Sequence, residues 1–153
     1  MAYRRIHGKG GYRRDEKVAV SAITPGMLVE LTSADEVQPH STEGGRAELI
    51  VAEEDALQGQ IVTHAYEADE IVTLAIADPG SEWQMLIASG ETITIGEQLI
   101  SAGDGTLKAL DNATSASAVA QVVAVALETS QTAAGEDGAL AADTLLKVRL
   151  QQI

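Results

Sequence analysis

Residues 71–87 read IVTLAIADPGSEWQMLI, and no other stretch says more about the fold. Large apolar residues occupy every second position on both sides of a central Asp-Pro-Gly-Ser sequence. They are Val72, Leu74, Ile76, Trp83, Met85 and Ile87. A period of two is typical of a strand that places one face on a core, and Asp-Pro-Gly favours a turn. The stretch therefore predicts two consecutive strands joined at residues 78–81.

The same alternation recurs on both sides of this stretch, with turn residues between the segments. Further strands are expected at 18–22, 27–32, 47–52, 61–66 and 146–150, at Ile93 and Ile95, and as two short strands around Gly103-Asp104-Gly105. Residues 119–127 fit a doubly buried strand or an Ala-rich helix, and three Val among residues 122–125 favour the strand.

Residues 33–46 and 129–143 are polar and predict long loops, while residues 53–59 predict an acidic turn or one turn of helix closed by Gly59. Nothing in the pattern resembles alternation of strands and helices. The sequence therefore predicts an all-β fold, a small β-barrel or β-sandwich with an extended N-terminal arm and at most a short helix.

The composition of the 153 residues fits one domain with a thin core. There is no Phe and one Trp, so Ala, Val, Ile and Leu must fill the interior, which favours completion of the surface by further copies of the chain. The absence of Cys excludes disulfides and thiolate metal sites. Neither a signal peptide nor a membrane-spanning run is recognisable, so we expect a soluble protein made inside the cell.

Charge divides the chain at residue 17. Residues 1–17 carry a net charge of +4, whereas residues 18–153 carry −17, for a total of −13. We therefore expect a basic arm, residues 1–17, joined to a single acidic domain, residues 18–153. Such an arm cannot form its own core and would order on a partner.

Within the arm, Tyr3-Arg4-Arg5 and Tyr12-Arg13-Arg14 repeat one aromatic residue and two guanidinium groups. This pairing suits a nucleic acid, through stacking and phosphate contacts, or an acidic protein surface, through Arg–carboxylate pairs. A solvated tail is the third possibility. The acidic domain argues against nucleic acid binding over its own surface.

Catalytic and metal-binding patterns are missing. His7, His40 and His64 have no metal-ligand spacing, and no Ser has the surroundings of a hydrolase nucleophile. The carboxylates at 53–55 and 69–70 are expected in solvated loops, and the run Gly8-Lys9-Gly10-Gly11 lacks the spacing and the preceding strand of a phosphate-binding loop. We expect no enzyme activity and no cofactor. A swinging-arm carrier would need a modifiable Lys at the tip of the 103–105 hairpin, and the nearest, Lys108, lies beyond it.

Four blocks of the sequence together resemble a known family. They are residues 51–59, 65–72, 86–93 and 96–107, with 124–128 and 146–150 fitting the same pattern. They are similar to the head decoration, or capsid cement, proteins of tailed bacteriophages. One departure is Ala68-Asp69-Glu70, where the family pattern leads us to expect a Gly before the strand at Ile71.

The resemblance implies a virion structural protein, a small β-protein that forms a homotrimer on the outer capsid surface and clamps major capsid protein subunits, after synthesis in the host cytoplasm. From charge alone, we expect the arm to contact the capsid through Tyr3, Arg4, Arg5, His7, Lys9, Tyr12, Arg13 and Arg14. Membrane binding is not expected and nucleic acid is an unlikely partner. A nucleic-acid-associated protein that uses the same arm, or another phage structural component of the tail or a fibre, is the alternative.

Overall fold

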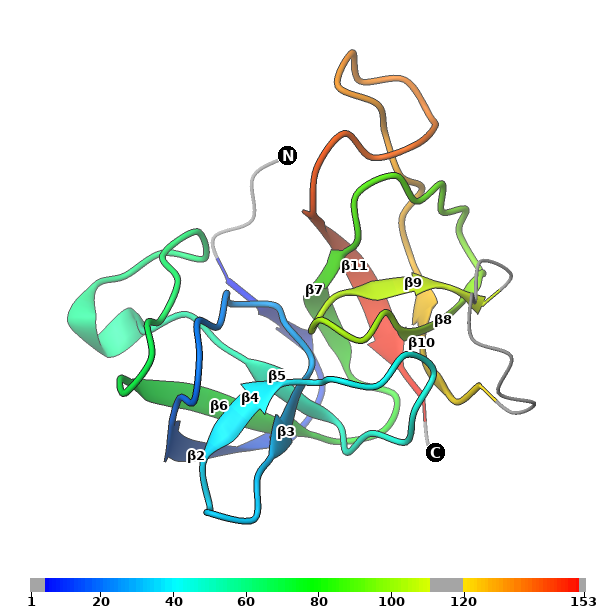
Figure 1. Cartoon of the computed structure of the whole chain (residues 1–153). Coiled ribbons are helices and arrows are strands. Elements are labelled where there is room, and N and C mark those ends of the chain that lie inside the picture. The colour runs from blue at the N-terminus through cyan, green and yellow to red at the C-terminus, as the bar shows by residue number, and fades with distance from the viewer. Residues whose placement is uncertain (1–4, 111–119, 152–153) are drawn as a thin grey trace.

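The computed structural model describes residues 5–110 and 120–151, which form strands and one short 3-10 turn (Figure 1). The strands are β1 (His7–Lys9), β2 (Tyr12–Val18), β3 (Val29–Leu31), β4 (Val37–Pro39), β5 (Ile50–Ala52), β6 (Ile71–Ala77), β7 (Glu82–Ile87), β8 (Gln98–Ser101), β9 (Leu107–Ala109), β10 (Val122–Ala126) and β11 (Thr144–Leu150). The turn η1 (Ala56–Gln58) ends at Gly59, which is left-handed with φ 73°. The predicted all-β fold with at most a short helix is confirmed.

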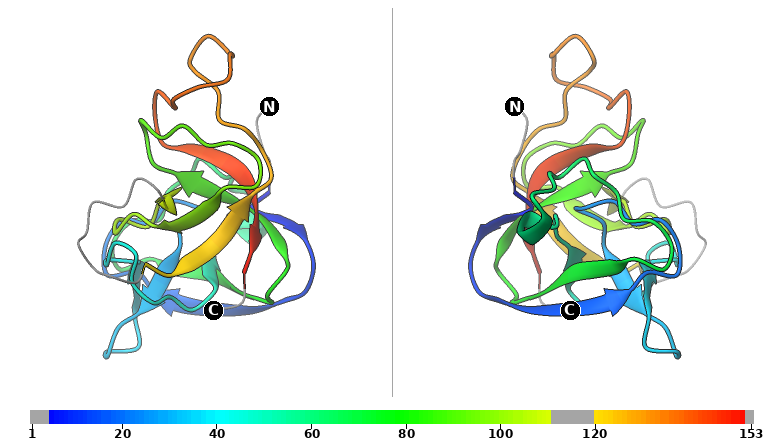
Figure 2. Two further views of the ribbon diagram at one scale, coloured as in Figure 1. Left: turned by 90° about the vertical axis from the view of Figure 1, so that its right-hand side faces the viewer. Right: turned by 90° about the vertical axis from the view of Figure 1, so that its left-hand side faces the viewer.

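Five strands from the C-terminal half close into a barrel, seen at the right of Figure 1 and from the side in Figure 2. Their order is β7, β11, β10, β8 and β9, and the pairing of β9 with β7 at Leu107 and Ile87 closes the ring. The predicted strands around Gly103-Asp104-Gly105 are β8 and β9, and residues 122–126 are a strand and not a helix.

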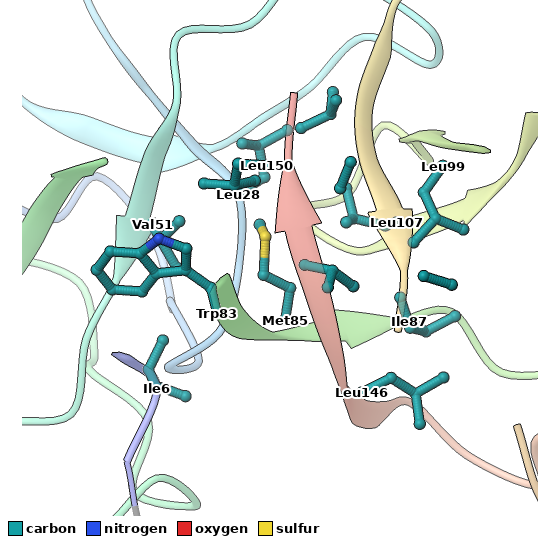
Figure 3. Packing of buried hydrophobic residues seen from close by; sticks show 14 of the residues in the cluster. Ile6, Leu28, Val51, Trp83, Met85, Ile87, Leu99, Leu107, Leu146 and Leu150 are labelled. Carbon is teal, nitrogen blue, oxygen red and sulfur yellow. The ribbon is translucent and has the colours of Figure 1, made fainter. Parts of the chain in front are cut away.

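The core at the barrel consists largely of aliphatic side chains, and Trp83 lies at one end of the cluster beside Val51 and Ile6 (Figure 3). Trp83, Met85 and Ile87 of β7 point inward, and so do Leu146 and Leu150 of β11, as the alternation predicts. Gln84 is the exception, since the outward position expected for it is buried. Residue 6 lies beside it in the chain pairing, since the Gln84 N–H donates to the Ile6 carbonyl at 2.7 Å.

The N-terminal half adds the sheet β2-β6-β5 and the hairpin β3-β4. One face of this sheet, with Val51 and Ala75, joins the barrel core. The other face, with Ile50 and Leu74, packs with β3 and β4 in a second core. The sheet therefore lies between two apolar clusters, which explains why its central strand β6 is apolar on both faces.

Residues 7–18 and 71–83 form one long two-stranded ribbon across both halves of the molecule. β1 pairs with β7 and β2 with β6, both antiparallel, and in Figure 2 the first strands run along the outside from the barrel to the lower sheet. Ile6 is fully buried at the start of this segment. The N-terminal segment is extended as predicted, but the expectation that it orders only on a partner is wrong for residues 6–17, because their backbone pairs with the rest of the chain.

Glycines allow the ribbon to bend where it passes between sheets. Gly10 has φ +98°, and a Cβ built there would lie 2.8 Å from Cβ of Ser81. A Cβ at Gly8 would lie 2.7 Å from the Glu82 carbonyl oxygen. The run Gly8-Lys9-Gly10-Gly11 is therefore needed for backbone approach and not for phosphate binding.

Four local predictions are wrong. The expected strand 18–22 does not form, because β2 ends at Val18 and residues 19–22 contain only an isolated bridge at Ala19. Residues 61–66 form turns with only an isolated bridge at Tyr66, residues 37–39 are a strand inside the expected loop 33–46, and Ile93 and Ile95 lie outside strands. Each error concerns a short segment whose pairing is set by distant residues. The turn before Ile71 is left-handed at Asp69, with φ 70°, where a Gly was expected.

Candidate functional site

Six of the eight residues expected to contact a partner belong to the part of the chain that the structure describes. Tyr3 and Arg4 lie outside it. Arg5 is exposed just before β1, which carries His7 and Lys9, and β2 carries the other three, Tyr12, Arg13 and Arg14. The structure places all six along the outer strand of the ribbon.

His7 and Tyr12 form a cluster with the buried Trp83. The centroids of the three rings are 4.5 Å apart for His7 and Tyr12, 4.8 Å for His7 and Trp83, and 5.1 Å for Tyr12 and Trp83. The tilted and edge-on arrangements are favourable for aromatic pairs. His7 Nε2 also lies 2.9 Å from the Gly10 carbonyl oxygen. These two side chains therefore hold the ribbon on the barrel and are only partly available to a partner.

Arg14 also interacts within the chain. Its guanidinium lies 6.0 Å from the centre of the Tyr12 ring, and its Nε lies 3.6 Å from Oε1 of Glu53. Glu53 is only 3% exposed, and burial raises the pKa of its carboxyl group while Arg14 opposes that rise. The attraction of Glu53 likewise raises the pKa of Arg14.

The neighbouring carboxylate, Glu54, fixes the start of the ribbon. Its Oε2 accepts a hydrogen bond of 3.0 Å from the Ile6 N–H. Asp55 accepts from the Gln58 N–H and caps η1. The expectation of a solvated acidic loop at 53–55 is therefore wrong for Glu53 and Glu54, which are buried and face the basic segment. No local pattern could indicate this contact, because 48 residues separate Ile6 from Glu54.

Arg5, just before the ribbon, and Lys9 and Arg13 on it are exposed, and unlike Arg14 none of them has an ion pair with residues that the structure describes. Lys9 lies opposite Glu82, which in turn lies opposite Arg149 in the barrel sheet, with Arg149 Nη2 3.9 Å from Glu82 Oε2. These three cations can pair with an external acidic surface without loss of an internal contact.

One Ser–His contact has the distances of a catalytic pair. His40 Nδ1 lies 2.6 Å from Ser101 Oγ, and His40 Nε2 lies 2.8 Å from the Arg46 carbonyl oxygen. Because that carbonyl can only accept, Nε2 carries a proton, and Nδ1 lies within hydrogen-bond distance of the serine hydroxyl. Both side chains are buried, so no substrate reaches Ser101. The contact ties the 40–46 loop to β8.

The described residues include no cluster of three or more His, Cys, Asp or Glu side chains that could hold a metal ion. Within the same residues, no helix is long and apolar enough to cross a membrane. The site is therefore best described by its charges, its aromatic cluster and its rigid ribbon.

The fold is similar to a solved structure described as the head fiber gp8.5 N base in bacteriophage phi29. The TM-score is 0.53 and the sequences are 17% identical, over 94% of this chain and 99% of that chain. At this identity the likeness concerns the fold alone. No protein-family model matches the chain, and no curated protein matches it.

Proposed function

We propose that this chain is a structural protein of a tailed-bacteriophage virion. The observation that carries the proposal is the likeness of nearly the whole fold to the base of a phage head fibre. It agrees with the resemblance of roughly residues 47–150 to capsid decoration proteins. The buried state of Ser101 and His40 also fits a protein without enzyme activity.

More specifically, we propose that the protein decorates the outer capsid surface as a homotrimer across major capsid protein subunits. Arg5, Lys9 and Arg13 are the contact residues that we favour, because they are exposed and have no ion pair within the described chain. Three copies of the same charged ribbon on one trimer would make each later contact intramolecular. Modest single contacts could then give an avidity gain of roughly 10²–10⁴.

Removal of residues 1–17 is not a clean test, because it would delete β1 and β2 and uncover Trp83. The sharper experiment changes Arg5, Lys9 and Arg13 together to Gln and measures co-sedimentation with capsids that lack the protein. We expect at least about a tenfold loss of affinity, with unfolding unchanged. Arg46→Gln, which removes an exposed cation elsewhere, is the control.

Undiminished binding of the triple variant would overturn the role of the ribbon, while absence of binding by the parent protein would overturn capsid decoration itself. Sedimentation equilibrium of the free protein tests the trimer, which requires three times the mass of one chain. The base of a head fibre is the alternative favoured by the structural likeness. Electron microscopy of decorated capsids would separate the two, because a fibre base supports a projecting fibre.

A nucleic-acid-associated role is the weaker alternative, since only the ribbon is basic. It requires a mobility shift with single-stranded DNA or RNA that is lost steeply as salt increases. No shift at low salt would exclude it.

A further inference from the structure

Exposed apolar side chains gather at one end of the sheet β2-β6-β5. Leu57 is 86% exposed, Ile61 61%, Ile71 60% and Val18 38%. Val18, at the end of β2, lies directly opposite Ile71, at the start of β6. Figure 1 shows η1, with Leu57, at this same end of the sheet, away from the barrel. We call these four residues the apolar corner.

Two open hollows flank η1 at the apolar corner. Leu57 lines one of about 350 Å³ together with Glu16 and Thr73, a cross-strand pair next to Val18 and Ile71. Ile71 lines the other, of about 390 Å³, together with Gln60 and His64, between which Ile61 lies in the chain. Asp55 borders both hollows. The surface thus has protruding aliphatic side chains with a hollow beside them. Side chains of a bound polypeptide can pack into such hollows.

The rim of the apolar corner is acidic. Glu16, Asp55 and Glu70 line the two hollows, and Glu67 and Asp69 are exposed just before β6. Two cations lie nearby, and each is paired within the chain. Arg14, which lines the first hollow, lies against Glu53, and Lys17 Nζ lies 2.7 Å from Asp35. Two copies that met through this surface around a two-fold axis would bring like charges together, which is unfavourable. Charge complementarity therefore selects a basic partner.

We propose that the apolar corner binds a basic polypeptide segment that carries aliphatic or aromatic side chains. The apolar side chains of the segment cover Leu57, Ile61 and Ile71, and its Lys or Arg residues face the rim. This surface is opposite in charge to the ribbon cations. The protein would thus have two separate docking surfaces, and the second does not depend on a role in a virion.

The test titrates the full chain, labelled at Ile, Leu and Val methyl groups, with a short peptide of alternating Lys and Leu. We expect NMR shifts of Leu57, Ile61, Ile71 and Val18, and about a tenfold loss of affinity in Ile71→Ser. Ile95→Ser is the matched control, because Ile95 is 62% exposed but borders a different hollow beside β11. A peptide of alternating Glu and Leu should cause no shifts.

A second variant separates binding from folding. Asp69→Gly places a glycine at a left-handed position, so the free energy of unfolding should stay equal or become higher. The same change removes a negative charge from the rim, so the affinity for the basic peptide should fall several-fold. Any one of the following results with the peptides would overturn the proposal: no shifts at the apolar corner, shifts as large at Ile95, or equal binding of the acidic peptide. Shifts that grow with protein concentration alone would identify a second copy as the occupant and would also overturn it.

Discussion

Nε of Arg14 lies 3.6 Å from Oε1 of Glu53, an ion pair between the outermost strand of the ribbon and a carboxylate that is almost fully buried. Part of the positive charge at the N-terminus is therefore matched by negative charge inside the same chain. The cations available to a partner are Arg5, Lys9 and Arg13, because none of them pairs with a buried carboxylate.

Arg14→Gln should destabilise the protein by about 1–3 kcal/mol, because it leaves Glu53 buried without its opposite charge. Arg13→Gln, one residue earlier on the same strand, removes an exposed cation and should change stability by no more than about 0.5 kcal/mol. Urea unfolding of both variants measures the difference. Equal stabilities would mean that the Arg14–Glu53 pair contributes nothing measurable.

The same pair predicts a pH dependence. Burial raises the pKa of Glu53 above its usual 4.5, so the folded state holds this proton more tightly than the unfolded state. Its contribution to stability is thus complete below pH 4.5 and is lost as pH rises through the raised pKa. Glu53→Gln stays neutral, so its free energy of unfolding should fall less between pH 4.5 and neutral pH than that of the parent.

Glu30 gives a contrast of opposite sign. Burial alone would raise its pKa, but hydrogen bonds from Ser41 and Gln38 and the nearby His40 hold the pKa below 4.5. Its contribution is present above pH 4.5 and is lost as pH falls through the lowered pKa. Glu30→Gln should therefore flatten the acid side of the profile. For Glu53, a stability-versus-pH profile of Glu53→Gln that runs parallel to that of the parent would contradict the raised pKa.

The elements that could be predicted from the sequence are those that one local pattern determines. Strand β11 has the expected inward and outward faces, and η1 ends at Gly59 as its sequence indicates. The ribbon could not be predicted, because β2 is exposed on both faces and shows no alternation. Only its pairing with β6, some sixty residues away, makes it a strand.

For the candidate site, the sequence indicates which residue types lie in the N-terminal segment but not which distant residues they contact. Basic and aromatic side chains of the segment 5–14 lie close together. The buried residues that contact this segment, Trp83, Glu53 and Glu54, are distant from it in the sequence. Charge counting treats every cation as solvated. It cannot separate Arg14, which lies against a buried carboxylate, from Arg13 beside it.

The bend in the ribbon predicts a specific requirement for glycine. Gly10→Ala introduces a Cβ at φ +98° that would lie 2.8 Å from Cβ of Ser81, so it should cost about 2–4 kcal/mol. Gly80→Ala is the matched control, since Gly80 has φ +85° but no atom within 4 Å of the added Cβ. It should cost only about 1 kcal/mol, the expense of the left-handed conformation alone.

Thermal unfolding of the two variants gives the comparison, and the larger loss at Gly10 measures the close approach of β1 to residue 81. Amide exchange at Gln84, whose N–H donates to Ile6, should also become faster in Gly10→Ala, because the start of the ribbon is released. Identical melting temperatures would show that the approach can relax without cost.

Ser101 and His40 allow the last prediction, which separates a structural from a catalytic contact. Ser101→Ala removes the hydroxyl that serves Nδ1 of His40 and also accepts from the Gly103 N–H at 3.2 Å, so it should destabilise the fold by about 1–3 kcal/mol. Ser41→Ala is the control, because Ser41 is exposed and this substitution should change stability by less than about 1 kcal/mol.

A fluorophosphonate probe should not label the parent protein, since Ser101 is inaccessible. Labelling of the parent that Ser101→Ala abolishes would instead identify Ser101 as a nucleophile and would overturn the structural role.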